Sequence, residues 1–85
     1  MQEFAYEIQN PVGLHARPAG GLVKVATELD SVVTLAVGEK CVEATHLFGL
    51  LKLGVRKGDV VRVSVSGGAE AANLQTLKEF FQANL

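Results

Sequence analysis

The sequence has almost no excess charge of either sign and only one cysteine, and both shortages exclude classes of protein. Eight lysines and arginines stand against nine aspartates and glutamates, which gives a formal net charge of −1. This balance predicts neither a nucleic-acid nor a membrane partner, because such binding relies on a surplus of basic residues. The single cysteine, Cys41, can form no internal disulfide. We interpret it as a small strand residue of a cytoplasmic protein.

Long apolar runs and targeting signals are missing as well. No hydrophobic stretch approaches the ~20 residues that a membrane-spanning helix needs. The N-terminal residues Met1 to Phe4 do not form a signal peptide. The chain of 85 residues also contains no repeat, linker or low-complexity tract, so we expect residues 1–85 to form one domain.

Metal-ligating residues are few and scattered. His15, Cys41 and His46 lie far apart in the sequence and lack the spacing of a metal site. We therefore expect no metal, and we assign no other cofactor.

The periodicity of apolar residues predicts seven secondary-structure elements. Alternation, of which Val61, Val63 and Val65 give the cleanest case, indicates half-buried strands. Apolar residues three and four positions apart indicate helices that bury one face. The order is strand, helix, strand, strand, helix, strand, helix, over residues of about 2–9, 16–28, 31–37, 40–44, 46–53, 61–65 and 69–84. We expect an α+β fold in which three helices cover one face of a four-stranded sheet.

The predicted helix over 16–28 has one apolar and one open face. The apolar face consists of Ala19, Leu22, Val23, Ala26 and Leu29. The open face, which we consider for partner docking, carries Arg17, Gly20, Lys24 and Thr27. Gly20 and Gly21 each cost about 1 kcal/mol relative to alanine inside a helix. Two interpretations remain open: the glycines reflect sequence drift or a weakly formed helix, or a partner packs closely against Gly20.

The predicted short helix over 46–53 is too apolar for a single buried face. Thr45 is placed to cap this helix, and Gly54 is placed to end it. One helix face cannot bury five large apolar residues against a sheet, so some should form an exposed docking patch. We expect two residues inward and three outward, namely Leu50 and Leu53 inward and Leu47, Phe48 and Leu51 outward. The alternative is that all five belong to the core.

One stretch carries the chemistry, Gly13-Leu14-His15-Ala16-Arg17-Pro18-Ala19-Gly20-Gly21. Pro18 suits the first turn of a helix, where its missing N–H costs nothing, so His15 lies at or just before the helix cap. The free N–H groups of Ala16 and Arg17 and the positive end of the helix dipole then form an anion site. The guanidinium of Arg17 matches phosphate oxygens, and a neutral imidazole nitrogen is a nucleophile. The chemistry that fits is a histidine that accepts a phosphoryl group and passes it on. His15 and Arg17 are the reacting residues, and Ala16, Arg17 and Pro18 surround the phosphate.

The run Gly-Leu-His-Ala-Arg-Pro-Ala resembles the active-site signature of the HPr family, the histidine-containing phosphocarriers of the bacterial sugar phosphotransferase system. The resemblance covers nearly the whole chain, through Leu47 to Gly54 and the length itself. It implies an open-faced β-sandwich of order βαββαβα with sheet order 1-4-2-3. It also implies that enzyme I, charged from phosphoenolpyruvate, phosphorylates Nδ1 of His15, and that the group passes to a histidine of a sugar-specific enzyme IIA domain. Such a carrier is not an enzyme, needs no cofactor and is expected to be a monomer.

The sequence departs from the family pattern at two positions. Gram-positive members carry a serine at the start of the second helix, which a dedicated kinase phosphorylates. Here His46 holds that position and Thr45 is out of register, so we assign no regulatory serine. Many relatives have a small polar side chain where this chain has Val12, so its phosphate site relies more on backbone N–H groups and Arg17.

Rival functions remain open beside the sugar-system carrier. One is an HPr-like regulatory binding module, although the reactive histidine is present as His15. Another is a carrier in a regulatory phosphotransfer branch, which the missing serine favours. A purely structural scaffold would leave the His-Ala-Arg-Pro cluster unexplained.

Overall fold

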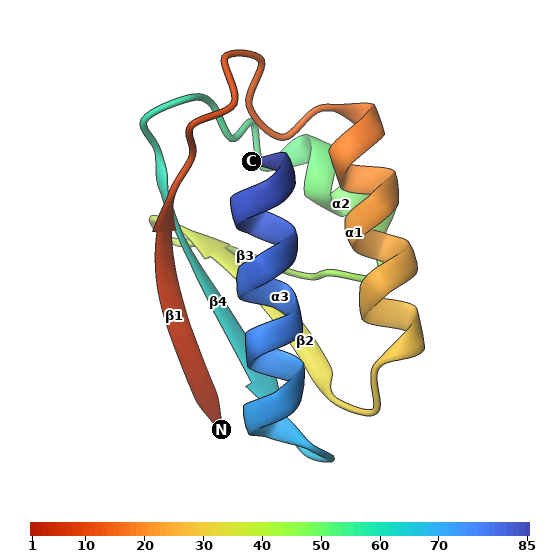
Figure 1. The fold of residues 1–85 in the computed structure, drawn as a ribbon. Helices are drawn as coiled ribbons and strands as arrows, with labels where there is room; N and C mark the ends of the chain where they lie inside the picture. Colours follow the sequence, from red (N-terminus) through yellow and green to blue (C-terminus); the bar gives the residue numbers. More distant parts are fainter.

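The computed structural model describes residues 1–85 and has the predicted order of strands and helices (Figure 1). The elements are β1 (Gln2–Glu7), α1 (Ala16–Glu28), β2 (Val32–Val37), β3 (Lys40–Glu43), α2 (Leu47–Lys52), β4 (Val60–Ser66) and α3 (Glu70–Asn84). None of these helices combines the length and the apolar character that crossing a bilayer requires.

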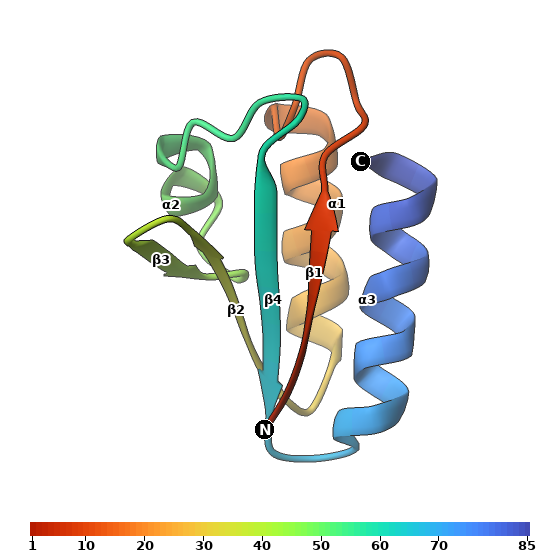
Figure 2. The same cartoon turned by 90° about the vertical axis from the view of Figure 1, so that its left-hand side faces the viewer.

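The four strands form one antiparallel sheet with the order β1-β4-β2-β3, which confirms the order implied by the resemblance. β4 pairs with β1 and β2, and β3 pairs only with β2, so β1 and β3 are the two edges. Figure 2 shows α1 and α3 on the same side of β1 and β4. α2 packs against α1 and β3 and completes the helical layer. The opposite face of the sheet is left open.

The hydrophobic core lies between the sheet and the helices. Its 18 buried residues form one cluster, to which β4 contributes three fully buried valines, Val61, Val63 and Val65. From α3, the ring of Phe81 meets the rings of Phe4 and Tyr6 edge-on, with centroid distances of 5.7 and 5.5 Å. Edge-to-face pairs of this kind add about 0.5–1.5 kcal/mol to the stabilisation from buried area. The alternate side chains of β1 and β4 that face inward therefore pack against the buried face of α3.

The predicted apolar face of α1 is confirmed, although two of its members are only half-buried. Ala19, Leu22 and Ala26 are buried, and Val23 and Leu29 are half-buried against the same core. α1 runs without a break from residue 16 to residue 28, as predicted.

The first strand ends earlier than predicted. β1 stops at Glu7, because the following residues turn toward the end of α3. The N–H groups of Gln9 and Asn10 donate to the carbonyl oxygen of Leu85 at 2.5 and 2.8 Å. The ends of most other elements differ from the predicted ones by one residue.

The second helix begins at Leu47, one residue later than predicted. Its N-cap residue is His46, so the predicted Thr45 cap is wrong, and no side chain makes a capping hydrogen bond. The predicted stop at Gly54 is confirmed. Its φ of +66° lies in the left-handed region that favours glycine after a helix.

The apolar residues of α2 divide differently from the prediction. Leu50 and Leu53 are buried and Phe48 is 77% exposed, as expected. Leu47 and Leu51 are half-buried and pack against the core, so the expectation that both are exposed is wrong. The exposed apolar part of this helix is therefore smaller than predicted and centres on one phenylalanine.

α2 approaches β3 closely at Gly49. A Cβ at Gly49 would overlap the side chain of Val42, so glycine lets the helix lie this near the strand without displacing that side chain. Leu47 and Leu51, two residues to either side of this glycine, are half-buried against the core.

A hydrogen-bonded cluster, here called the Asp30 clasp, joins the segment after α1 to the segment before α3. Asn73, which is only 8% exposed, donates through Nδ2 to Asp30 Oδ1 at 2.6 Å and to Ser31 Oγ at 2.8 Å. The Ala69 N–H also donates to Asp30 Oδ1, at 3.2 Å, and Ser31 Oγ donates to the Gly67 carbonyl oxygen at 2.5 Å. The Asn73 hydrogen bond, followed by that of Ala69, lowers the pKa of the Asp30 carboxyl.

Replacing Asp30 with asparagine is expected to destabilise the fold at neutral pH and to reduce its sensitivity to acid. The lowered pKa means that the folded protein favours the charged carboxylate more than the unfolded chain does. Its stabilisation is therefore complete above the ordinary pKa of 3.8 and is lost as the pH falls through the lower folded value. Urea unfolding at a series of pH values from neutral to strongly acidic measures this dependence.

The matched control is Glu3→Gln, which removes an exposed carboxylate outside the clasp. Some acid sensitivity should remain in every variant, because the Gly67 N–H and the N-terminal ammonium lower the pKa of Glu70. An Asp30→Asn protein whose stability falls with acid as steeply as that of the parent would contradict the role of the clasp.

Candidate functional site at the start of α1

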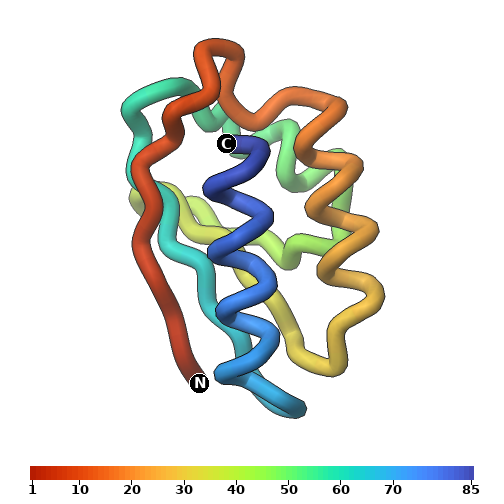
Figure 3. The backbone as a smooth tube through the Cα atoms, viewed as in Figure 1, coloured from red at the N-terminus to blue at the C-terminus, as the bar shows by residue number.

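The loop between β1 and α1 is fixed before it reaches His15. Asn10 Oδ1 accepts a hydrogen bond from the Val12 N–H at 2.9 Å, and the Gly13 N–H donates to the Asn10 carbonyl oxygen at 2.9 Å. Asn10 Nδ2 donates to the carbonyl oxygen of Asn84 at 3.1 Å. An asparagine side chain stabilises a turn in this way by bonding the backbone two residues on. Figure 3 follows this loop at the same end of the molecule as the C-terminus.

Gly13 sets the direction in which the chain enters the helix. Its φ is +75°, and a Cβ there would overlap the Val55 carbonyl oxygen and lie 2.9 Å from Cα of Arg56. Leu14 is buried, and its N–H donates to the same Val55 carbonyl oxygen at 3.2 Å. The loop is therefore held against the segment before β4, and His15 follows directly.

His15 is the N-cap residue of α1, as predicted, and the helix does not use its side chain. Its backbone is extended, with φ −103° and ψ −175°, and its carbonyl oxygen accepts the Ala19 N–H at 2.9 Å. The half-buried imidazole makes no capping hydrogen bond. Ala16 and Arg17 are exposed and open the helix, where N–H groups have no acceptor in the preceding turn. Two backbone donors thus remain without an intrahelical acceptor in the residues that directly follow His15.

An open hollow of about 320 Å³ lies beside His15. It is lined by Asn10, His15, Arg17, Pro18, Gly21, Phe80, Ala83 and Asn84. The hollow brings together three of the predicted site residues, and Pro18 contributes an apolar wall without an N–H. Ala16 lies outside the hollow, on the exposed first turn.

Four lining residues escaped the sequence prediction, namely Asn10, Phe80, Ala83 and Asn84. Three of them belong to α3, at the other end of the chain. No periodicity or spacing connects these positions to His15, because the tertiary fold alone brings them together. The Asn10-Pro11 pair predicted a turn, but it did not predict that Asn10 lines the site.

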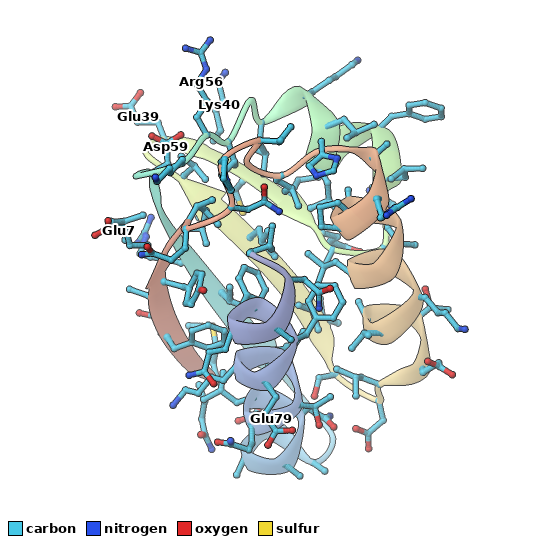
Figure 4. All side chains as sticks on the ribbon, turned by 45° about the horizontal axis from the view of Figure 1, so that its top comes forward. Glu7, Glu39, Lys40, Arg56, Asp59 and Glu79 are labelled. Atoms are coloured by element: carbon cyan, nitrogen blue, oxygen red, sulfur yellow. The ribbon has the colours of Figure 1, made fainter.

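Basic side chains outnumber acidic ones on α1 and α2. α1 carries Arg17 and Lys24, and α2 ends in Lys52. The only acidic residue of these two helices is Glu28, at the far end of α1. On the neighbouring loop, Arg56 extends outward (Figure 4). α1 and α2 together therefore carry a positive charge, which suits an anion or an acidic protein surface.

The residues predicted to dock partners lie on α1 and α2, which pack against each other. Lys24 and Thr27 are exposed, Gly20 is half-exposed, and Phe48 projects from α2. The Thr27 hydroxyl donates to the Val23 carbonyl oxygen at 2.7 Å, so its methyl group is the part left to a partner. The exposed members of this set thus lie on two helices that are in contact, the first of which begins directly after His15.

The two glycines of α1 have different surroundings. A Cβ at Gly20 would have no atom within 4 Å, whereas a Cβ at Gly21 would lie 3.2 Å from two atoms of the Phe80 ring. Close packing inside the molecule therefore accounts for Gly21 but not for Gly20. The helix is continuous through both glycines.

The histidines and the cysteine do not come together in the fold. No group of three or more His, Cys, Asp and Glu side chains is close enough to hold a metal ion. Cys41 is a free, exposed thiol on β3, and His46 is exposed at the start of α2.

Comparison with known proteins decides the family. The family model described as "PTS HPr component phosphorylation site" matches residues 2–83. The chain belongs to the HPr family. As an HPr-family protein, it is a phosphoryl carrier of the phosphotransferase system.

Relatives with solved or curated descriptions agree with this assignment. The phosphocarrier protein HPr of Xylella fastidiosa (strain Temecula1) is 33% identical over 82 residues, which cover 96% of this chain and 92% of that one. The crystal structure of an HPr from Thermoanaerobacter tengcongensis superimposes with a TM-score of 0.91 at 35% identity, covering 98% and 93% of the two chains. A multiphosphoryl transfer protein of Xanthomonas campestris pv. campestris is 36% identical over 77 residues. This match covers 91% of this chain but only 9% of that protein.

Gly20→Ala is expected to stabilise the protein, because the methyl group meets nothing and alanine favours the helix by about 1 kcal/mol. For a domain of this size, that gain corresponds to a Tm higher by roughly 4–8 °C. Gly21→Ala is the matched control and should gain less, since the Phe80 ring must move to admit the methyl group. Thermal unfolding followed by circular dichroism gives both values. Equal shifts in the two variants would contradict the difference in surroundings.

Proposed function

We propose that Nδ1 of His15 carries the phosphoryl group, which it receives from enzyme I and passes to a histidine of a sugar-specific enzyme IIA domain. The observation that supports this most directly is the position of the imidazole. It makes no capping hydrogen bond, and His15 directly precedes Ala16 and Arg17, whose N–H groups open the helix. The family points to the same role, since its model is described by a phosphorylation site.

The arrangement suits in-line phosphoryl transfer. The Nδ1 lone pair of neutral His15 attacks phosphorus, and an N–P bond forms as the bond to the donor atom breaks. The N–H groups of Ala16 and Arg17 and the positive end of α1 then face the phosphoryl oxygens. The Arg17 guanidinium adds charge-assisted hydrogen bonds, and Pro18 lines the hollow as an apolar wall. Positive groups thus stand where negative charge spreads in the transition state.

A carrier must also release the group, and the surroundings of the site fit this requirement. Val12 has no polar side-chain atom, and both ends of the Asn10 amide are engaged within the fold. Neither residue therefore adds a strong hydrogen bond to the phosphate. The phosphoryl group relies on backbone N–H groups and one exposed arginine in an open hollow, where water weakens each interaction.

We assign partner binding to one docking surface, which consists of Gly20, Lys24, Thr27, Leu47, Phe48 and Leu51. Its positive charge favours acidic partner surfaces and speeds their approach. Its exposed apolar centre, Phe48, has the character of an interface anchor. Because the surface borders His15, enzyme I and enzyme IIA use it in turn rather than together.

We further propose that the chain is a monomeric, single-domain carrier of the cytoplasm that catalyses no reaction of its own. The chemistry above uses one nucleophile and one phosphoryl group, so neither a cofactor nor a metal is assigned. No nucleic acid and no membrane is assigned as a partner. The exposed thiol of Cys41 suits a reducing compartment.

A carrier in a regulatory phosphotransfer branch is the second candidate. The residue at the start of α2, where Gram-positive relatives carry the regulatory serine, is the exposed N-cap residue His46. An imidazole cannot accept a phosphate in place of a hydroxyl and form the same stable ester. Serine-based control is therefore not assigned to this chain, and the enzyme IIA domains that accept its phosphoryl group would distinguish the two branches.

His15→Ala is expected to abolish phosphorylation by enzyme I and phosphoenolpyruvate, because it removes the nucleophile. In the parent protein the adduct should be labile in acid and stable in alkali, as a phosphohistidine is. Mass spectrometry of the labelled protein locates the group. A label that survives in His15→Ala, or one found on His46, would overturn the proposed function.

Arg17→Ala tests the second reacting residue in the same assay, since it keeps the nucleophile and removes only the guanidinium. This side chain is exposed, so its loss should change the free energy of unfolding by no more than about 0.5 kcal/mol. Transfer should nevertheless slow strongly, because the charge on the moving group is no longer matched. Normal transfer rates, or a large loss of stability, would count against this role.

Phe48→Ala is expected to weaken docking without weakening the fold. The apparent KM for enzyme I should rise by an amount that corresponds to ~1–3 kcal/mol of binding. The cost in stability should stay well below the ~3–5 kcal/mol of a buried phenylalanine, since Phe48 is 77% exposed. Leu50→Ala, at a buried position of the same helix, is the control and should lower the stability of the fold. An unchanged KM for Phe48→Ala would remove this residue from the docking surface.

A further inference from the structure

The outer edge of β1 is not covered by another part of the chain. β1 pairs with β4 alone, and in Figure 2, which views the molecule from this side, no other element lies in front of it. Just past the strand, the Ile8 N–H donates to the Asp59 carbonyl oxygen at 2.9 Å, and the Ile8 carbonyl oxygen accepts the Gly58 N–H at 2.8 Å. Both backbone groups of Ile8 therefore face the β4 side.

Because the backbone N–H and C=O of Ile8 point toward β4, the side to which these groups point is known for each earlier residue of β1. Backbone groups of successive residues point to opposite sides of a strand, so those of Glu3, Ala5 and Glu7 point to the free edge. The Glu7 carbonyl oxygen accepts the Gln9 side-chain amide at 3.2 Å, and beyond it the edge meets the end of α3. The N–H groups of all three residues and the carbonyl oxygens of the first two remain for an outside partner.

A hollow of about 280 Å³ adjoins this edge on the side of α3. It is lined by Phe4, Ala5, Tyr6, Lys78 and Gln82. The two aromatic rings are half-buried and pack against the core, and Nζ of Lys78 lies 5.8 Å from the centroid of the Phe4 ring. The hollow therefore offers apolar surface to side chains that extend over this side of the edge.

On the open face of the sheet, the same edge is acidic rather than apolar. Glu3 and Glu7 are exposed there on either side of Ala5, and Figure 4 shows Glu7 pointing away from the ribbon. The one salt bridge of the chain joins the N-terminal amine to Glu70, so neither carboxylate of the edge has an ion-pair partner. Two negative charges thus flank the free backbone groups, with the exposed Arg62 of β4 opposite Ala5 as the basic residue next to them on the inner side.

We propose that the β1 edge binds an extended peptide segment of a partner protein as an added strand, with the residue pattern basic, apolar, any, apolar, basic. Directly opposed residues of neighbouring strands place their side chains on the same face. Basic residues opposite Glu3 and Glu7 then meet the carboxylates on the open face, and apolar residues opposite Phe4 and Tyr6 enter the hollow. Main-chain hydrogen bonds to the free groups supply the pairing itself.

A second copy of the chain does not fit this edge. The antiparallel register that joins the most free groups of two β1 strands places Ala5 opposite Ala5. Each Glu3 then faces Glu7 of the other copy, so four carboxylates meet in two like-charged pairs, which destabilise strand pairing. Charge complementarity therefore selects a basic segment of a different protein.

This interaction goes beyond phosphoryl transfer and is independent of it. In Figure 1, β1 and α1 lie on opposite sides of α3, so the edge is well separated from the docking surface. A bound segment would leave His15 accessible to enzyme I and enzyme IIA. The protein would then hold one partner at the β1 edge while it exchanges phosphoryl groups at the other surface.

The test uses the synthetic peptide acetyl-Ser-Lys-Val-Thr-Val-Lys-Ser-amide, titrated into the isotopically labelled full chain and followed by NMR. The expected result is a saturable shift of the backbone amides of Glu3, Ala5 and Glu7. Hydrogen exchange at these three N–H groups should slow, while the amides of the docking surface stay unchanged. Shifts confined to the docking surface, or no saturable shift, would overturn the proposal.

Two control peptides separate the contributions. The same peptide with glutamate in place of both lysines, and the same peptide N-methylated at the lysines and the threonine, should not bind. Equal binding by either control would contradict the charge or the strand pairing on which the proposal relies. Shifts of β1 amides that grow with protein concentration in the absence of peptide would instead assign the edge to a second copy.

Variants of the chain complete the test. Glu3→Gln combined with Glu7→Gln should weaken peptide binding about five-fold at low salt, the size expected for two exposed ion pairs. Ala5→Pro removes one free N–H without touching the ladder to β4 and should abolish binding. Both variants should be phosphorylated by enzyme I at the rate of the parent protein, so a failure here leaves the proposed function of His15 intact. Full peptide affinity in both would overturn the proposal.

Discussion

The site depends on the close contact between the Gly13 backbone and the Val55 carbonyl group. Gly13 has no Cβ and can adopt a positive φ, so the loop lies directly against the segment before β4. The adjacent Leu14 is then buried, and His15 emerges at the first turn of α1 with its ring outside the helix. Any larger residue would move the histidine relative to the hollow. The chemistry of an exposed side chain is therefore set by a backbone contact that carries no charge.

What the sequence predicted well was encoded locally. The position of Pro18 marks the first turn of α1, and the φ of Gly54 shows why the second helix ends there. The features that it predicted poorly depend on contacts between residues that are far apart in the sequence. Leu47 and Leu51 are half-buried against the core where α2 approaches β3 at Gly49, and α3 lines the hollow although no pattern relates it to the motif. A helix face tells which residues are apolar, but the neighbouring strand decides how deeply each is covered.

The near-neutral net charge conceals an uneven distribution. α1 and α2 carry three basic residues and one acidic residue, which lies at the far end of α1. The edge strand β1 carries two acidic residues and no basic one. Opposite fields on separated surfaces let one small protein attract different kinds of partner, although its total charge is close to zero. The overall composition therefore argued against strong binding to polyanions, but it did not show where on the surface charged partners are attracted.

The Asp30 clasp has a consequence for the motion of α1. The helix is tied at its start through Gly13 and Leu14, and just past its end through Asp30 and Ser31. A helix held at both ends is expected to unwind less readily than one with a free terminus, which should slow the exchange of its amide hydrogens. The contacts of Gly13 and Leu14 orient the start of α1, and the clasp secures the segment that follows its end. An exposed reactive group can thus be presented on a rigid support without being buried itself.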